Sequence, residues 1–220
     1  LEIRMEHPPV SEGVTLGGFL DEVASATPTP GGGTVAALAG ALGAALVSMV
    51  AGLTRGKKKY AAVEPEMADA QREAQALRAR LVALMRQDAQ AFDAVLGAMR
   101  LPQATPAEAA ARQGAIEAAT WTAARVPLET AEACLAVSRW AARMVRSGNV
   151  NAASDGLVAA ALGRAACEGA LCNVEINLQS LPDSADKQAV TGRVHDLARH
   201  AEEALTEART AFRIATERTA

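Results

Sequence analysis

Apolar residues recur at intervals of three and four along most of the chain, and no segment alternates in the manner of a half-buried strand. This pattern favours helices throughout, broken by stretches rich in proline and glycine. Thr34 is placed to N-cap a buried helix, and Thr105 forms a capping box with Glu108. The predicted helices cover residues of about 16–25, 35–55, 65–100, 106–122, 127–148, 154–178 and 184–217.

We expect one all-α domain over residues 15–220, preceded by a flexible tail over residues 1–14. The 53 alanines among 220 residues favour helices that pack closely through small side chains. A net charge of -3 and a pI of about 5.7 argue against a dedicated nucleic-acid-binding protein. The tail lacks the apolar stretch of a signal peptide, and the three cysteines fit neither a disulfide framework nor a zinc site, so we expect a cytoplasmic location.

One segment invites comparison with a membrane span, because no charge occurs between Glu22 and Arg55. Its bulky residues follow one stripe, whereas small residues recur every four positions on another ridge, where a neighbouring helix can approach closely. We therefore expect a buried central helix at a helix–helix or subunit contact, and no membrane association. The bulky stripe comprises Val35, Leu38, Leu42, Leu46, Met49 or Val50, and Leu53; the small ridge comprises Ala36, Gly40, Ala44, Ser48 and Gly52.

A carboxylate interrupts the apolar face of the longest predicted helix, over residues 65–100. Asp88 occupies a position where the spacing calls for leucine. A buried carboxylate needs a partner and often has a raised pKa, which makes Asp88 a candidate general base. The structural alternative is an aspartate paired with an arginine or lysine of another helix. The face consists of Leu77, Leu81, Leu84, Asp88, Phe92, Val95 and Met99.

Two further features are compatible with an anionic ligand. Gly31, Gly32 and Gly33 precede a helix, where backbone N–H groups can approach a ligand and the helix dipole favours anions. A tight turn between crossing backbones explains the same glycines equally well. Lys57 and Lys58 follow the C-terminal end of that helix. They are either part of a solvated surface or a binding site for an anionic tail.

Polar residues near two later helices form the remaining candidate site. The loop over 148–155 contains Asn149 and ends in Ser154 and Asp155, of which capping explains Ser154 but not Asn149. Asn173 and Asn177 lie one turn apart within an apolar helix. Their amides bond either to neighbouring helices or to the donor and acceptor edge of a heterocycle.

Metal and nucleophilic chemistry find no support in the pattern. His195 and His200 are five residues apart and do not share a helix face, and no Glu-x-x-His motif occurs. No Gly-x-Ser-x-Gly motif is present either. We expect no metal ion and no covalent intermediate.

Several motifs, in this order, resemble the cyclodeaminase/cyclohydrolase family of folate enzymes, which includes the C-terminal half of bifunctional formimidoyltransferase-cyclodeaminase. The resemblance extends from about residue 16 to the end of the chain. The motifs are Phe19-Leu20-Asp21-Glu22-Val23-Ala24-Ser25, Pro30-Gly31-Gly32-Gly33, Gly56-Lys57-Lys58, Asp88-Ala89-Gln90-Ala91-Phe92, Met99-Arg100-Leu101-Pro102, Val126-Pro127-Leu128, the 148–155 loop and Asn173-Val174-Glu175-Ile176-Asn177-Leu178.

The resemblance implies an all-α subunit in an intertwined dimer that acts on a tetrahydrofolate derivative without a metal or redox cofactor. It places the family's catalytic aspartate on Asp88. It implies cyclisation of 5-formimidoyl-tetrahydrofolate to 5,10-methenyl-tetrahydrofolate with release of ammonia. Lys57 and Lys58 are candidates for the glutamate tail of the folate, and Asn149, Asn173 and Asn177 for the pterin or for positioning Asp88.

Two alternatives stay open at the level of the sequence. The same site suits a methenyltetrahydrofolate cyclohydrolase, which opens the methenyl cation to 10-formyl-tetrahydrofolate, because both reactions pass through a tetrahedral carbon between N5 and N10. The second alternative is a helical oligomer that binds a folate without catalysis, in which Asp88 is purely structural.

Overall fold

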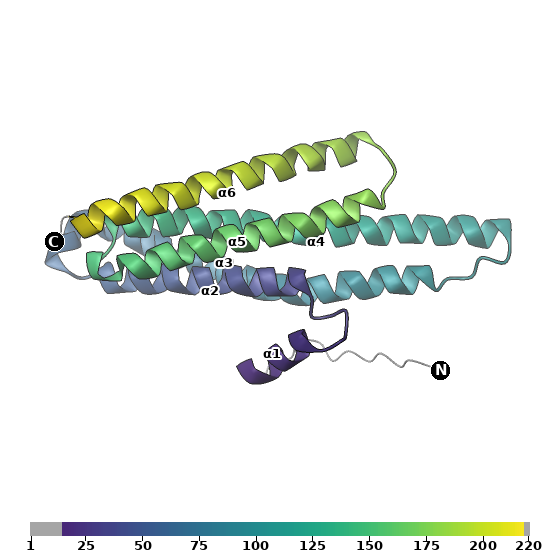
Figure 1. The fold of residues 1–220 in the computed structure, drawn as a ribbon, viewed down its shortest axis with the longest axis horizontal. Coiled ribbons are helices and arrows are strands. Elements are labelled where there is room, and N and C mark those ends of the chain that lie inside the picture. The colour runs from purple at the N-terminus through teal and green to yellow at the C-terminus, as the bar shows by residue number, and fades with distance from the viewer. Residues whose placement is uncertain (1–14, 218–220) are drawn as a thin grey trace.

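The computed structural model describes residues 15–217, which form a bundle of long α-helices and contain no strand (Figure 1). The expected tail, residues 1–14, lies outside the described residues. The predicted all-α class is confirmed over the described part of the chain. The α-helices are α1 (Leu16–Ala24), α2 (Gly32–Thr54), α3 (Glu64–Met99), α4 (Pro106–Ser147), α5 (Ala153–Gln179) and α6 (Ala185–Glu217); the 3₁₀ helices are η1 (Lys58–Val63) and η2 (Val150–Ala152).

Helix α2 packs against α3, α4 and α5, and its small residues make this close approach possible. A Cβ atom on Gly40 would lie 2.5 Å from Sγ of Cys134 in α4. The ridge of small residues therefore packs inside the subunit, with Ala36, Gly40 and Ala44 buried. The opposite, bulky stripe is the more exposed one.

Helix α4 is continuous from Pro106 to Ser147, so the prediction of two helices that meet near Pro127 is wrong. Proline has no N–H to donate to the carbonyl four residues earlier, which here is Ala123 O. Asn177 Nδ2 of α5 donates to this oxygen over 2.9 Å. The side chain of α5 thus satisfies the carbonyl that Pro127 leaves without its helical donor, and this bond compensates for part of the cost of proline in the helix.

The helix starts differ from prediction at two of three caps. Thr105 and Glu108 form the predicted capping box. Helix α2 begins earlier than expected, with Gly31 as its N-cap, so Thr34 lies inside the first turn. Ser154 makes no cap bond, because α5 begins at Ala153 after the 3₁₀ helix η2, which the Asn149 side chain caps.

Helices α2 and α5 present an apolar surface that no described element covers. Leu42 and Leu53 of α2 are 52% and 45% exposed, and Ile176 of α5 is 63% exposed. By length and composition both α2 and the segment Val150–Gln179 pass as membrane spans, although only the first was expected to invite that comparison. About half of each apolar window, 50% and 44% respectively, is buried inside the bundle.

Helix α1 stands off the bundle, below α2 in Figure 1. Phe19 is its one buried residue, whereas Leu16 and Leu20 are 72% and 57% exposed. The apolar side of α1 therefore remains largely without a partner in the described chain.

Candidate active site

Asp88 of α3 lies at the N-terminal end of α2. Its Oδ2 accepts a hydrogen bond of 2.9 Å from the Thr34 hydroxyl, and the Thr34 backbone also hydrogen-bonds to the carboxylate. Among residues 15–217, no lysine or arginine forms an ion pair with Asp88. The structure therefore does not show the expected structural alternative of an Arg or Lys partner.

Two opposing influences set the pKa of Asp88. Burial raises the pKa, and the hydrogen bonds from the Thr34 side chain and backbone lower it; burial dominates, so the pKa lies above its ordinary value. A half-buried carboxylate with a raised pKa and no cationic partner has the properties of a candidate general base.

The glycine turn allows this close approach of α2 and α3. A Cβ atom on Gly33 would lie 2.4 Å from Oδ1 of Asp88, so any other residue there would displace the carboxylate. A Cβ on Gly32 would lie 3.8 Å from Nδ2 of Asn173, which places Asn173 beside the same turn. Gly31, Gly32, Gly33, Asp88 and Asn173 thus form one cluster, which we call the acidic cluster.

The amide nitrogens of the two α5 asparagines are engaged by the protein. Asn173 Nδ2 donates to Gly169 O, and Asn177 Nδ2 donates to Ala123 O and Asn173 O. Within residues 15–217, neither side-chain oxygen accepts a hydrogen bond. Asn177 therefore has a clear structural role beside Pro127, and both asparagines retain an acceptor.

Asn149 lies at the other end of α2 and is structural there. Its backbone N–H donates to the Thr54 hydroxyl over 2.8 Å, and Nδ2 donates to Leu53 O. Tyr60 Oη lies 3.5 Å from Asn149 Oδ1 and accepts from the Val150 N–H. The expectation that Asn149 positions Asp88 is therefore wrong within one chain, because the length of α2 separates them.

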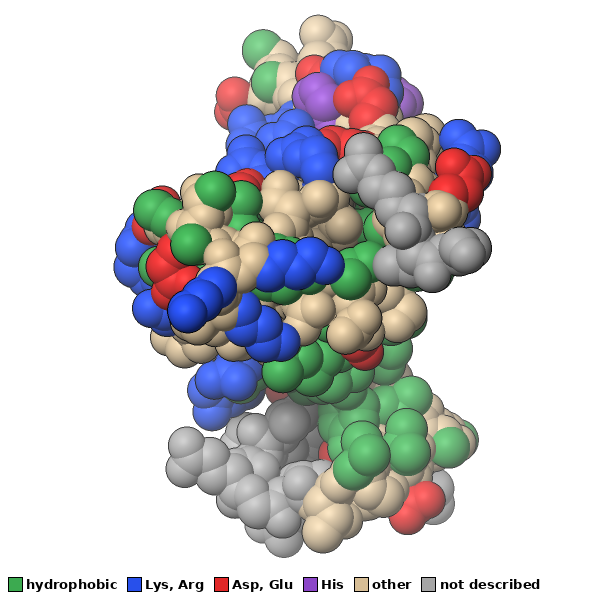
Figure 2. All heavy atoms as spheres, turned by 90° about the vertical axis from the view of Figure 1, so that its left-hand side faces the viewer, with side chains coloured by type: hydrophobic (Ala, Val, Ile, Leu, Met, Phe, Trp, Pro, Cys, Tyr) green, Lys and Arg blue, Asp and Glu red, His purple; other side chains and the backbone are tan. Residues whose placement is uncertain are grey.

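Lys57, Lys58, Ser154 and Asp155 belong to this same end of the bundle, where α2 ends and α5 begins. Both lysines are exposed, and neither forms an ion pair within residues 15–217. Figure 2 faces this end and shows many Lys and Arg side chains gathered on it. We call Lys57, Lys58 and Asn149 the basic cluster.

The two clusters are separated by most of α2. The twenty residues from Gly33 to Leu53 span about 30 Å at ~1.5 Å per residue. The structure therefore brings together about half of the predicted site residues around Asp88 and the other half at the far end.

Sequence reasoning missed Thr34 and Tyr60 as partners of the predicted residues. Thr34 was interpreted as an N-cap, and its burial beside Asp88 depends on a contact between residues 54 positions apart. Tyr60 carried no local signal. In the described part of the chain, no group of three or more His, Cys, Asp or Glu residues is arranged to hold a metal ion.

Fold and site together define an all-helical enzyme subunit with a carboxylate at a glycine-lined helix start. The sequence model of the formiminotransferase-cyclodeaminase family matches residues 15–196. The chain belongs to this family and is an enzyme of the cyclodeaminase or cyclohydrolase type.

Three relatives illustrate the range of the family. The chain is 44% identical to a methenyltetrahydrofolate cyclohydrolase of Methylorubrum extorquens, over 78% of this chain and 82% of the relative. It is 36% identical to the formimidoyltransferase-cyclodeaminase of Rattus norvegicus over 85% of this chain, but spans only 35% of that protein. The solved formiminotetrahydrofolate cyclodeaminase of Thermotoga maritima is 30% identical, with a TM-score of 0.83 over 91% of this chain and 96% of that one.

Proposed function

We propose that the protein is a methenyltetrahydrofolate cyclohydrolase in which Asp88 is the general base. The observation that carries the proposal is the Asp88 carboxylate, half-buried, without a cationic partner and with a raised pKa. The sequence alone favours cyclodeamination over the cyclohydrolase reaction, and the order is reversed here. It rests on the relative with 44% identity, a cyclohydrolase that this chain matches over 82% of its length.

The reaction needs one proton acceptor beside the carbon that bridges N5 and N10. Asp88 takes a proton from water as the oxygen adds to this carbon, which forms a tetrahedral intermediate. The carbon–N5 bond then breaks, N5 keeps one proton of the water, and the second proton leaves to solvent as 10-formyl-tetrahydrofolate forms. As an anion, the carboxylate also stabilises the methenyl cation electrostatically.

Cyclodeamination is the second candidate, supported by the cyclodeaminase of Thermotoga maritima and the bifunctional relatives. N10 attacks the carbon of the protonated formimidoyl group (N5–CH=NH2+), and Asp88 removes the N10 proton and returns it to the departing nitrogen. That nitrogen then leaves as NH3, and the methenyl cation remains. The same carboxylate therefore acts first as base and then as acid.

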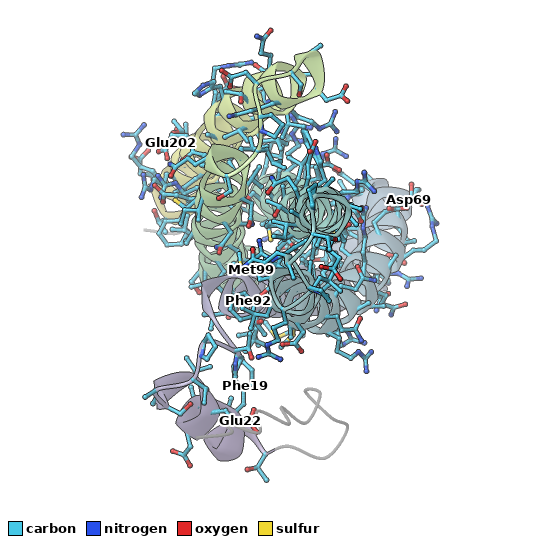
Figure 3. All side chains as sticks on the ribbon, turned by 90° about the vertical axis from the view of Figure 1, so that its right-hand side faces the viewer. Phe19, Glu22, Asp69, Phe92, Met99 and Glu202 are labelled. Carbon is cyan, nitrogen blue, oxygen red and sulfur yellow. The ribbon has the colours of Figure 1, made fainter. Side chains whose placement is uncertain are left out.

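The surroundings of Asp88 offer groups for the pterin. Phe92 lies one turn beyond Asp88 on the same side of α3 and is 36% exposed, so its ring is open to stacking. In the end view of Figure 3, Phe92 and Met99 project from the same side of α3, the side toward α1 with Phe19 and Glu22. The free oxygens of Asn173 and Asn177 suit the N–H edge of a pterin.

We assign the glutamate tail of the folate to Lys57 and Lys58, which are exposed and carry no ion pair in the described chain. Because such binding is electrostatic, raising the salt concentration should weaken the binding of a polyglutamyl folate more than that of the monoglutamate. Equal binding of both at low and high salt would remove the lysines from the site. Ser154 and Asp155 stay candidates for substrate contact, and the cytoplasmic location stays a prediction.

Near-ultraviolet absorbance of 5,10-methenyl-tetrahydrofolate tests the function directly. Loss of this absorbance from the preformed compound, accelerated by the protein, identifies a cyclohydrolase. Its appearance from 5-formimidoyl-tetrahydrofolate, with ammonia released, identifies a cyclodeaminase. Asp88→Asn should abolish either activity while preserving the helical fold. A folded wild type that is inactive on both substrates leaves the non-catalytic folate-binding protein as the better interpretation.

We also propose that the subunit forms a homodimer through the exposed bulky stripe of α2. Val35, Leu42, Met49 and Leu53 are 38%, 52%, 40% and 45% exposed, a continuous apolar face at helical spacing. A second copy of the chain is the proposed occupant, because Leu42 and Leu46 lie at equal distances on either side of Ala44, as do Val35 and Leu53, so the stripe can pack against its own copy.

A further inference from the structure

A cavity with a charged lining lies between α4 and α6, away from Asp88. Its volume of about 340 Å³ is within the range of small-molecule sites. Helix α6 packs against α4 and α5, whereas Asp88 lies where α3 meets α2, and Figure 1 shows α6 and α2 along opposite edges of the bundle. We call this space the arginine cavity; its lining includes Leu135, Arg139, Trp140 and Arg143 of α4 and Arg193 and Leu197 of α6.

The lining of the arginine cavity carries an excess of positive charge. Its three arginines and one glutamate, Glu132, leave a formal excess of two positive charges. The glutamate is engaged by one of the arginines, because Arg193 Nε donates to Glu132 Oε1 over 2.7 Å and so joins α6 to α4. Within residues 15–217, neither Arg139 nor Arg143 forms an ion pair. These two guanidinium groups are therefore available to an anion.

Arg139 and Arg143 lie one turn apart on α4, where like charges repel each other. At the same spacing in α5, Arg164 forms an ion pair with Glu168 instead. Trp140 holds Arg143 in place, because the guanidinium Cζ lies 4.7 Å from the centroid of the indole ring. A bound anion would relieve the repulsion between the two guanidinium groups, one of which already has a fixed position.

The chemistry of the lining points to one kind of anion. A guanidinium group donates two parallel hydrogen bonds to a phosphate group, and a phosphate monoester carries nearly two negative charges at neutral pH and offers three acceptor oxygens. It therefore matches both the excess charge and the three arginines. Leu135, Trp140 and Leu197 give the cavity an apolar part against which a ring can pack. We propose that the arginine cavity binds a phosphate monoester that carries a planar aromatic ring, the chemistry of a nucleoside monophosphate.

Equilibrium binding tests the proposal independently of the folate reaction. The probe is adenosine 5′-monophosphate, titrated into the full chain and followed by calorimetry. Its Kd should be at least about tenfold lower than that of adenosine or of inorganic phosphate, because each of these compounds contacts only one part of the cavity. The proposal is overturned if the monophosphate does not bind at about 1 mM, if inorganic phosphate binds as tightly, or if the aromatic dicarboxylate phthalate binds more tightly.

Arg139→Gln/Arg143→Gln tests whether the probe binds in this cavity. Both side chains are exposed, so the helical fold should persist, and the Kd should rise about tenfold or more through the loss of charged hydrogen bonds. The matched control is Arg78→Gln/Arg209→Gln, which removes two exposed arginines that do not line the cavity and should change the Kd by less than about twofold. Equal effects of the two double variants would show a response to net charge alone and would overturn the assignment.

Tryptophan fluorescence locates the bound ring. The chain has two tryptophans, Trp121 and Trp140, and Trp121 lines a separate cavity beside the start of α6. In Trp121→Phe, adenosine 5′-monophosphate should quench the fluorescence of Trp140 with the Kd found by calorimetry, because the adenine packs against the indole ring. In Trp140→Phe, the fluorescence of Trp121 should stay unchanged. Quenching in Trp140→Phe alone, or in neither variant, would place the ligand elsewhere and overturn the proposal.

Discussion

Gly33→Ala is the change that probes the site most selectively. The added Cβ would lie 2.4 Å from Oδ1, 2.7 Å from Oδ2 and 2.8 Å from Cγ of Asp88. Ordinary contact begins at 3.4 Å, so the carboxylate must move by about 1 Å. Because the colliding atoms form the end of one side chain, the helices need not separate, and the fold should persist.

The expected loss is much larger in activity than in stability. A displacement of about 1 Å in a catalytic group costs up to roughly 100-fold in rate, so kcat/KM should fall about 10- to 100-fold, or about 1.4–2.7 kcal/mol. The hydrogen bond from Thr34 to the carboxylate is worth about 1.5–3 kcal/mol. Alanine in a helix regains about 0.5–1 kcal/mol over glycine, so the net loss of stability should be about 1–2 kcal/mol.

Gly114→Ala in α4 is the matched control, because no atom lies within 4 Å of its added Cβ. It should raise stability by about 0.5–1 kcal/mol and leave activity unchanged. Methenyl absorbance gives kcat/KM, and urea unfolding gives stability. A Gly33→Ala protein with wild-type kcat/KM would show that the carboxylate need not lie against the start of α2, and would refute its assignment as base.

Three further predictions follow from individual contacts. Thr34→Val removes a hydrogen bond that lowers the pKa of Asp88, so the acidic limb of the pH–rate profile should move to higher pH, whereas Thr34→Ser should keep the wild-type limb. The pKa of Asp88 is raised in the folded protein, so the wild type loses stability as the pH rises through that pKa. Asp88→Asn should therefore be more stable to urea than the wild type at about pH 7, but not at about pH 3. A less stable variant at about pH 7 would indicate that the charge of Asp88 is stabilising. Gly40→Ala should lower the free energy of unfolding by about 1–3 kcal/mol, because the added Cβ collides with Cys134 Sγ. Cys134→Ala in the same protein should restore part of this stability. If the effects of the two substitutions simply add, the strain lies elsewhere.

The sequence predicts the helices of this fold well because their signals are local. The helical spacing, the capping box at Thr105 and the prolines that precede long helices all act within a turn or two of the chain. The error at Pro127 has a long-range cause. A proline normally marks a helix start, but here Asn177, fifty residues later, supplies the donor that the helix lacks. No local pattern contains that information.

The site was only partly predictable for the same reason. Asp88 could be identified because a carboxylate breaks an apolar stripe on its own helix. Its partner Thr34 could not, because the 2.9 Å bond joins two helices that only the tertiary fold brings together. Asn149 shows a related limit: its place in a polar loop gave no sign that its amide donates to Leu53 O at the C-terminal end of α2.

Helix α2 has one side that packs within the subunit and another that the proposed homodimer would cover. Its small ridge, with Gly40 against Cys134, packs against the rest of the subunit, so the bulky stripe is forced to the outside. A stripe of this kind is costly in water and favours a second copy. Its two ends carry complementary parts of the candidate site, the glycine turn with Asp88 and the lysines that follow Gly56. The absence of charge within α2 fits this arrangement: one side is buried within the subunit, and on the other side the proposed dimer would leave a charge without water or a partner.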